Sequence, residues 1–140
     1  MANKFETLIR LHQWQVDQAR RKLGDLLRLI GDLEDQAAAL EVELKEEQRI
    51  AAGAPEQAGF LYGAYAHDVI ERREGLAAAI AKTEEEAAEV QEEVREAYRE
   101  LKKYEITRDN RQRREAADRA RMEQTELDEV ALQTFRQRRE

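Results

Sequence analysis

The sequence contains no cysteine, one proline and six glycines in 140 residues, and only 6% of its residues are aromatic. Without cysteine the chain has no disulfide framework and no thiolate nucleophile or metal ligand, as is common in a reducing compartment. The few prolines and glycines leave few places to turn. No apolar run approaches the ~20 residues of a membrane span. These absences argue against a disulfide-rich secreted domain, a membrane-inserted chain and a loop-rich fold.

Charged residues make up 39% of the chain, with a net charge of −7, and Ala, Glu, Leu, Arg and Gln dominate the composition. This composition is typical of a coiled coil or a long helix. Intrinsic disorder is the alternative, because the mean hydropathy is low. The acidic balance argues against a general nucleic-acid binder. We therefore expect a cytoplasmic protein.

Periodicity decides between coiled coil and disorder. A first set of positions recurs at steps of four and three, and its only polar member is a histidine: Phe5, Ile9, His12, Val16, Ala19, Leu23, Leu26, Ile30, Leu33, Ala37, Leu40 and Leu44. A second set follows the same steps and includes an arginine and a threonine: Tyr62, Ala66, Val69, Arg73, Leu76, Ile80, Thr83, Ala87, Val90, Val94, Ala97, Leu101 and Tyr104. Two such heptad seams indicate two long helices.

The turn between the seams is predicted at residues 52–57. Gly53 can adopt the left-handed conformation that ends a helix, and Pro55 can begin the next one. Folding the chain at about residue 54 places Phe5 roughly opposite Tyr104. The sequence therefore predicts an all-α, single-domain fold over residues 1–140, an antiparallel coiled-coil hairpin with helices at about 4–51 and 58–138. A parallel dimer of one continuous helix is the rival, and the glycines and proline around the turn argue against it.

Residues beyond Tyr104 are predicted to be helical without a partner in the hairpin, as an overhang of the longer second helix. Acid-before-base pairs at a spacing of four, Asp109–Arg113 and Glu115–Arg119, would give it marginal support of ~0.2–0.5 kcal/mol each. The arginines concentrate here, at positions 108, 111, 113, 114, 119 and 121. Such a helix can bind a protein partner, remain solvated, or bind nucleic acid or lipid. Acidic residues lie between these arginines, and no aromatic side chains accompany them on which bases could stack. Both features argue against nucleic-acid binding.

Nothing in the pattern supports catalysis. His12 and His67 are far apart along the predicted hairpin and lack a metal-ligand spacing. No glycine-rich phosphate loop is present, and a two-helix rod offers no closed pocket. We expect no enzyme activity, no cofactor and no metal site.

Three apolar groups lie off the seams. Leu11 and Trp14 share the outer face of the first helix, and Phe60 and Leu61 lie beside the turn. The third group is a short stripe near the C-terminus: Leu127, Val130, Ala131 and Phe135. Local helix packing is the simpler interpretation of each group, but clusters on a thin rod favour partner sites. Trp14 is the strongest candidate, since Trp is enriched in binding hot spots.

The stretches "KFETLIRLHQWQVDQARRKLGDL" and "LDEVALQTF" resemble the opening and the closing segments of the flagellar export protein FliJ family. Chain length, turn position and the long second helix agree with this resemblance. It implies a cytoplasmic coiled-coil component of the flagellar type III export apparatus, peripheral to the cytoplasmic face of the inner membrane and not inserted into it. It also implies likeness to the central stalk of rotary ATPases.

The resemblance further implies that the end bearing both termini enters the hexameric export ATPase and activates it. The candidate contacts there are Leu11, Trp14, Arg108, Arg111, Arg113, Arg114, Leu127, Asp128, Glu129 and Phe135. The other end would face the membrane export gate protein through Phe60, Leu61, Tyr62 and Tyr65, and export chaperones are further expected partners. The alternatives are a general coiled-coil chaperone or scaffold of a type III secretion system, including an injectisome stalk, and a nucleic-acid-binding helix.

Overall fold

The computed structural model describes residues 4–53 and 55–139, and the side chains of residues 4–53 and 62–139. It contains two helices, α1 (Lys4–Gly53) and α2 (Pro55–Arg139), and no strand in the described ranges. The all-α prediction is confirmed, and Pro55 does begin the second helix, as its fixed φ favours. The predicted turn at 52–57 is too long, because both helices extend into it. Gly53 is helical, and none of the described glycines has a positive φ, so the left-handed stop expected at Gly53 is wrong.

The contacts of the chain group into two compact units, Met1–Trp14 with Tyr98–Glu140, and Gln15–Ala97. Each helix contributes to both units. We call them the terminal unit and the central unit and describe each by itself.

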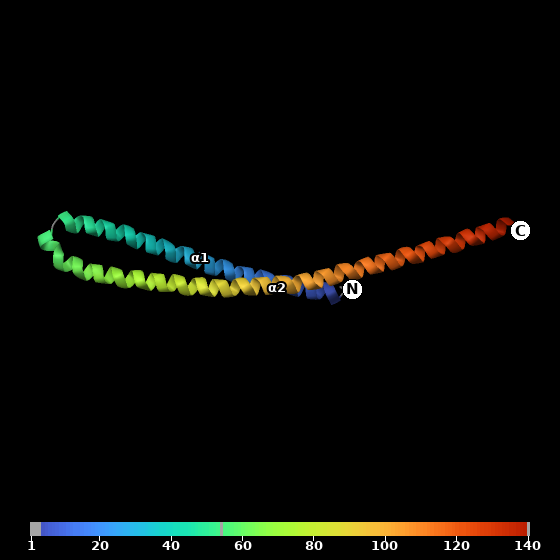
Figure 1. Cartoon of the computed structure of the whole chain (residues 1–140), viewed down its shortest axis with the longest axis horizontal. Helices are drawn as coiled ribbons and strands as arrows, with labels where there is room; N and C mark the ends of the chain where they lie inside the picture. Colours follow the sequence, from blue (N-terminus) through green and yellow to red (C-terminus); the bar gives the residue numbers. More distant parts are fainter. Residues whose placement is uncertain (1–3, 54, 140) are drawn as a thin grey trace. The chain divides into compact units, whose positions relative to one another are not determined.

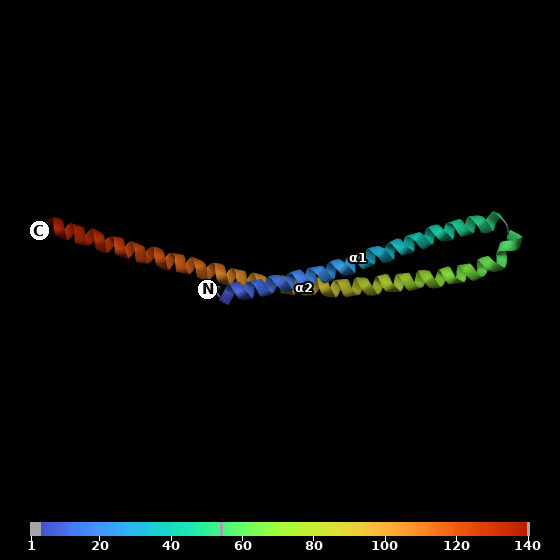
Figure 2. The ribbon, with the colours of Figure 1, turned by 180° about the vertical axis from the view of Figure 1, so that it is seen from behind.

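In the central unit α1 and α2 lie side by side and run in opposite directions (Figures 1 and 2). Lys22 Nζ lies 3.7 Å from a carboxylate oxygen of Glu93, and Arg73 on α2 contacts Glu41 on α1. Since the higher α1 number pairs with the lower α2 number, these contacts confirm the antiparallel arrangement. A buried cluster of this unit is formed by Leu40, Leu44 and Val69, against which Tyr65 and Leu76 pack.

Two polar residues of the second seam are accommodated in different ways. Thr83 is buried, and its Oγ1 donates a hydrogen bond of 2.7 Å to the carbonyl oxygen of Ala79. A buried hydroxyl thus keeps a partner within its own helix. Arg73 instead extends its guanidinium out of the seam, where Nε and Nη2 each lie 2.5 Å from a carboxylate oxygen of Glu41. The remaining described seam positions of the central unit are buried or half-buried, as predicted.

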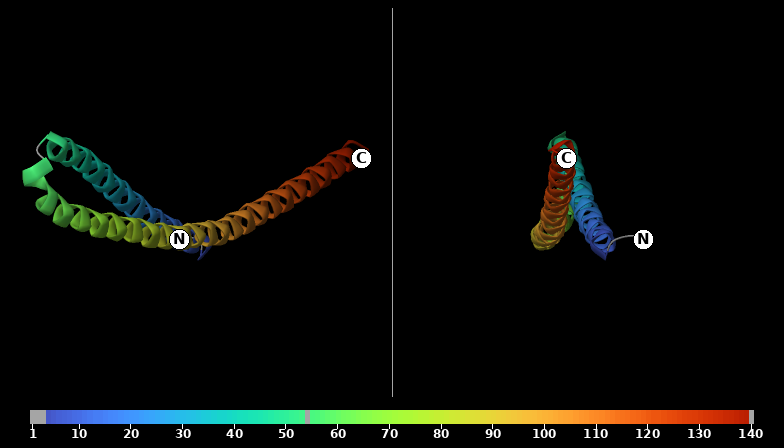
Figure 3. Two further views of the ribbon diagram at one scale, coloured as in Figure 1. Left: turned by 60° about the vertical axis from the view of Figure 1, so that its left-hand side comes forward. Right: turned by 90° about the vertical axis from the view of Figure 1, so that its right-hand side faces the viewer.

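In the terminal unit the start of α1 contacts α2, and α2 continues beyond the start of α1 as a single helix (Figure 3). Ile9 and Leu101 are buried there, and the His12 ring stacks on Tyr104 with centroids 4.6 Å apart. The sequence had placed Phe5, not His12, opposite Tyr104. The true register is shifted by one heptad, so that Phe5 lies against Arg111. A shift of seven residues keeps both seams facing each other, which is why periodicity could not detect it.

Candidate partner-binding surfaces

The C-terminal segment, residues 109–139, is a single helix in which every residue is exposed (Figure 1). Ion pairs form between residues that are close in sequence along this segment. Arg111 Nε lies 3.4 Å from a Glu115 oxygen, and Arg121 contacts Asp118. Asp109 and Glu115 each contact an arginine, although not the one predicted, since Asp109 pairs with Arg108. Exposed pairs of this kind add little stability, so the segment presents its surface to solvent without a packed core.

Arg108 and Arg111 belong to the packed end of the terminal unit. Arg108 Nη1 lies 3.7 Å from a Glu6 oxygen, and the Arg111 guanidinium lies 5.6 Å from the centroid of the Phe5 ring. The side chain of Arg108 is only 27% exposed. The sequence had assigned both to the partnerless overhang, and the one-heptad register shift explains the difference. Continuing the four-and-three steps from Tyr104 to positions 108 and 111 would have found them.

Arg113 and Arg114 have no ion-pair partner among the described residues. Arg114 lines an open cavity of about 350 Å³ together with Phe5, Thr107, Asn110 and Arg111. The Thr107 hydroxyl already donates to the carbonyl oxygen of Lys103, at 2.8 Å, and so presents only lone pairs. The guanidinium of Arg114 and the amide of Asn110 are left as donors. This arrangement can bind a carboxylate of a partner.

Both off-seam apolar groups of the terminal unit are exposed. Leu11 is 47% and Trp14 is 59% exposed. In the stripe near the C-terminus Leu127 is 64%, Val130 59% and Phe135 55% exposed, and the Arg139 guanidinium lies 4.9 Å from the Phe135 ring centroid. Asp128 accepts a hydrogen bond of 3.0 Å from Gln124, and Glu129 is exposed. The predicted contact residues are therefore accessible, but the structure places them on separate stretches of helix.

The gate-facing candidates differ from one another. The side chains of Phe60 and Leu61 lie outside the described residues. Tyr62 and Tyr65 are half-buried, with ring centroids 6.4 Å apart. Tyr65 packs on the Leu40–Leu44–Val69 cluster, and its buried hydroxyl has no hydrogen-bond partner among the described residues. Burial, reinforced by the Glu43 carboxylate, raises the pKa of Tyr65. Tyr65 is thus a core residue as well as a surface candidate.

The described residues contain no group of three or more His, Asp or Glu side chains arranged to hold a metal ion. Within the same ranges, neither helix has a stretch long and apolar enough to cross a membrane. The histidines lie in dissimilar settings: His12 stacks in the seam, whereas His67 is exposed, with Nε2 3.2 Å from a Glu71 oxygen.

Comparison with protein families places the whole chain in one of them, since the family model for the flagellar FliJ protein matches residues 1–140. The chain belongs to the flagellar FliJ protein family. No curated protein and no solved structure matches it. Family membership confirms the resemblance carried by the two end segments, and it favours the flagellar system over an injectisome.

FliJ-family membership assigns the chain to flagellar protein export, a type III secretion process, and associates it with the export apparatus. The family is a non-catalytic component of export.

Proposed function

We propose that this chain is the central stalk and activator of the hexameric flagellar export ATPase, with residues 109–139 inside the ring. The observation that carries the proposal is the fully exposed helical C-terminal segment. Apart from its first residues, where Arg111 contacts Phe5, this helix has no packing partner among the described residues. A helix that nevertheless keeps charged and apolar side chains along its length suits a pore formed by another protein. ATP hydrolysis belongs to the partner.

The mechanism is differential binding. A stalk that contacts several subunits at once binds the assembled ring more tightly than separate subunits, and so it shifts the assembly equilibrium toward the ring. Arg113 and Arg114 supply charge that is not used within the chain, and Leu127 and Phe135 supply apolar contact area. Asp128 and Glu129 add acidic contacts, and Leu11 and Trp14 lie where they can meet the mouth of the ring.

The proposal also gives a role to the residues beside the turn between α1 and α2. Tyr62, with Phe60 and Leu61, would face the membrane export gate protein, and export chaperones would be further partners. The chain would then act in the cytoplasm, peripheral to the inner membrane. A general coiled-coil chaperone or scaffold of type III secretion is the alternative, and it predicts activity that does not depend on residues 109–139.

Steady-state ATP hydrolysis by the cognate export ATPase tests the proposal. The intact chain is compared with a chain truncated after Glu115, which keeps the Arg108–Glu6, Arg111–Phe5 and Arg111–Glu115 contacts. We expect stimulation by the intact chain and none by the truncated one. Equal stimulation by both would overturn the stalk assignment in favour of a scaffold.

A charge variant makes the test sharper. Arg113→Gln with Arg114→Gln removes two guanidiniums that have no ion pair in the described chain, so the fold should be unaffected. Arg21→Gln is a matched control, because Arg21 is likewise exposed and unpaired among the described residues but lies in the central unit. Loss of stimulation in the double variant alone supports contacts by the C-terminal segment, whereas full stimulation by the double variant counts against them.

A further inference from the structure

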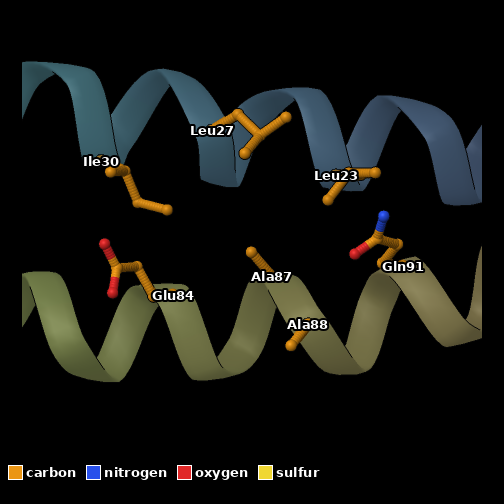
Figure 4. Close-up of a pocket in the computed structure, with 7 residues that line it drawn as sticks. All are labelled: Leu23, Leu27, Ile30, Glu84, Ala87, Ala88 and Gln91. Atoms are coloured by element: carbon orange, nitrogen blue, oxygen red, sulfur yellow. The ribbon is translucent and has the colours of Figure 1, made fainter.

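Two cavities of the central unit lie on one flank of the helix pair. The first has a volume of about 340 Å³ and is lined by Leu23, Leu27, Ile30, Glu84, Ala87, Ala88 and Gln91 (Figure 4). The second, of about 400 Å³, is lined by Ala37, Ala38, Leu40, Glu41, Arg73, Leu76, Ala77 and Ile80. The lining positions recur at helical spacings of three, four and seven, so both cavities belong to one groove along this flank.

The groove exists because α2 presents alanines where α1 presents leucines. Figure 4 shows the short side chain of Ala87 between Glu84 and Gln91, pointing toward α1, whereas the Ala88 side chain does not point toward the α1 side chains. As a result Leu27, which lines the cavity, remains 55% exposed. Apolar side chains thus line a groove that is open to solvent along this flank.

Two glycines in the middle of α1 lie on the same flank. Gly24 precedes Leu27 by three residues, and Gly31 follows it by four and precedes Ala38 by seven. A Cβ at Gly31 would meet nothing within 4 Å, and one at Gly24 would meet only the end of the Arg28 side chain. Glycine in a helix interior costs up to ~1 kcal/mol relative to alanine. No close packing within the central unit requires that cost, whereas close approach by another backbone would.

The two helix stretches that line the groove carry an excess of acidic residues, counted over all faces of each helix, and Glu84 lines the first cavity itself. Residues 23–40 contain four acidic residues and one basic residue: Asp25, Asp32, Glu34 and Asp35 against Arg28. Residues 76–91 also contain four acidic residues and one basic residue: Glu84, Glu85, Glu86 and Glu89 against Lys82. These stretches thus account for −6 of the chain's net charge of −7. Two such flanks brought face to face would repel, which disfavours a second copy in a symmetric dimer.

We propose that this groove docks one amphipathic helix of a partner protein, with an apolar stripe flanked by Lys and Arg, to form a three-helix coiled coil. The apolar stripe covers Leu23, Leu27 and Ile30, and the partner backbone approaches at Gly31. The flanking cations meet Glu84 and the neighbouring carboxylates. The site lies in the central unit and does not rest on the stalk proposal.

Fluorescence anisotropy with the full chain tests this docking. The probe is a labelled synthetic helix of about 21 residues with Leu and Ile at heptad positions and Lys and Arg beside them. Its counterpart carries Glu at the flanking positions. We expect the basic peptide to bind at least about tenfold more tightly, with affinity that falls as NaCl rises from about 0.05 M to about 0.5 M. Equal binding of the two peptides would overturn the proposed chemistry.

Groove-filling variants show where the peptide binds. Gly31→Leu and Ala88→Leu place a side chain in the groove at positions that can accept one. Gly75→Leu is the matched control, since Gly75 is exposed, has open space around its Cβ and lines neither cavity. We expect at least about tenfold weaker binding in the first two variants and none of that loss in the third. Unchanged affinity in Gly31→Leu and Ala88→Leu would place binding elsewhere and refute the proposal.

Self-association is the competing occupant. Sedimentation of the chain without peptide should give a monomer. A dimer that Gly31→Leu dissociates and Gly75→Leu does not would make the groove an interface between copies, which would overturn the assignment to a basic partner helix. Circular dichroism of each variant confirms that the helices remain formed.

Discussion

The central unit and the C-terminal segment are made of the same kind of helix, yet their stability has different sources. In the central unit each helix buries a seam against the other, with Val69 only 1% exposed. In the C-terminal segment the seam positions pass from Tyr104 to arginines and acids, and all of residues 109–139 are exposed. Helix propensity and ion pairs alone give marginal helices, whereas tertiary packing gives stable ones. The difference separates a part of the chain with a packed core from a part whose residues are all exposed.

Hydrogen exchange should show the largest contrast. We expect amides of residues 112–139 to exchange at least about 100-fold faster than those flanking Val69 and Leu40, because opening the single helix disrupts no packed core. Mass spectrometry of peptide fragments measures this directly. Addition of the cognate ATPase should slow exchange in the C-terminal segment. Full protection of that segment in the isolated chain would mean that the C-terminal segment is as stable as the central unit, and would contradict the difference drawn here.

Leucine truncations should separate the regions by stability. Leu40→Ala, at a position 6% exposed, should lower the free energy of unfolding by ~2–3 kcal/mol through lost burial and a residual cavity. Leu127→Ala, at a position 64% exposed, should change it by less than ~0.5 kcal/mol. Urea unfolding followed by far-UV circular dichroism gives both values. A large cost at Leu127 would mean that the C-terminal segment packs on something in the free protein.

Backbone substitutions should produce a smaller effect. Gly75→Ala should raise the unfolding free energy by ~0.5–1 kcal/mol, because Gly75 is exposed in mid-helix with nothing near its Cβ. The opposite change in the single helix, Ala120→Gly, should reduce helical signal without moving the main unfolding transition. Comparing the urea midpoint with the native ellipticity distinguishes the two responses. A shifted midpoint for Ala120→Gly would show that the regions unfold together.

Acidification should have the smallest specific effect. The hydrogen bonds from Arg73 lower the pKa of Glu41 below its ordinary value of 4.5. Because the folded-state pKa is depressed, the stabilisation is complete above pH 4.5 and is lost as the pH falls through the lower folded value. Glu41→Gln should therefore flatten the fall in melting temperature below pH 4.5. If Glu41→Gln leaves the fall in melting temperature below pH 4.5 unchanged, the Arg73–Glu41 pair adds nothing to stability.

The seams predicted the interior of the molecule closely. Ile9, Val16, Val69 and Val90 are all buried where alternate steps of four and three placed them. Such positions can be read from sequence because burial on a two-helix rod follows periodicity alone. The exception, Arg73, is also physically simple, since its long side chain leaves the seam to reach Glu41.

The candidate surfaces were less accessible to sequence reasoning. Arg108 and Arg111 were assigned to a free overhang, yet they contact Glu6 and Phe5. Tyr65 was assigned to a surface, yet its ring packs on the core. Each of these contacts depends on the register, that is, on which residue of α1 lies opposite which residue of α2. The groove beside Leu27 was not predicted either, because it depends on alanines of one helix facing leucines of the other.

The amino-acid sequence by itself determined that this chain forms two long helices, that Pro55 can begin the second one, and which face of each helix is buried, since these follow from local propensity and heptad spacing. Its end segments also carried the family. Tertiary structure decided the register, because shifts of one heptad are equivalent in pattern but differ in side-chain contacts. It thereby decided which arginines are already paired, which remain available to a partner, and where the flank of the coiled coil is left open.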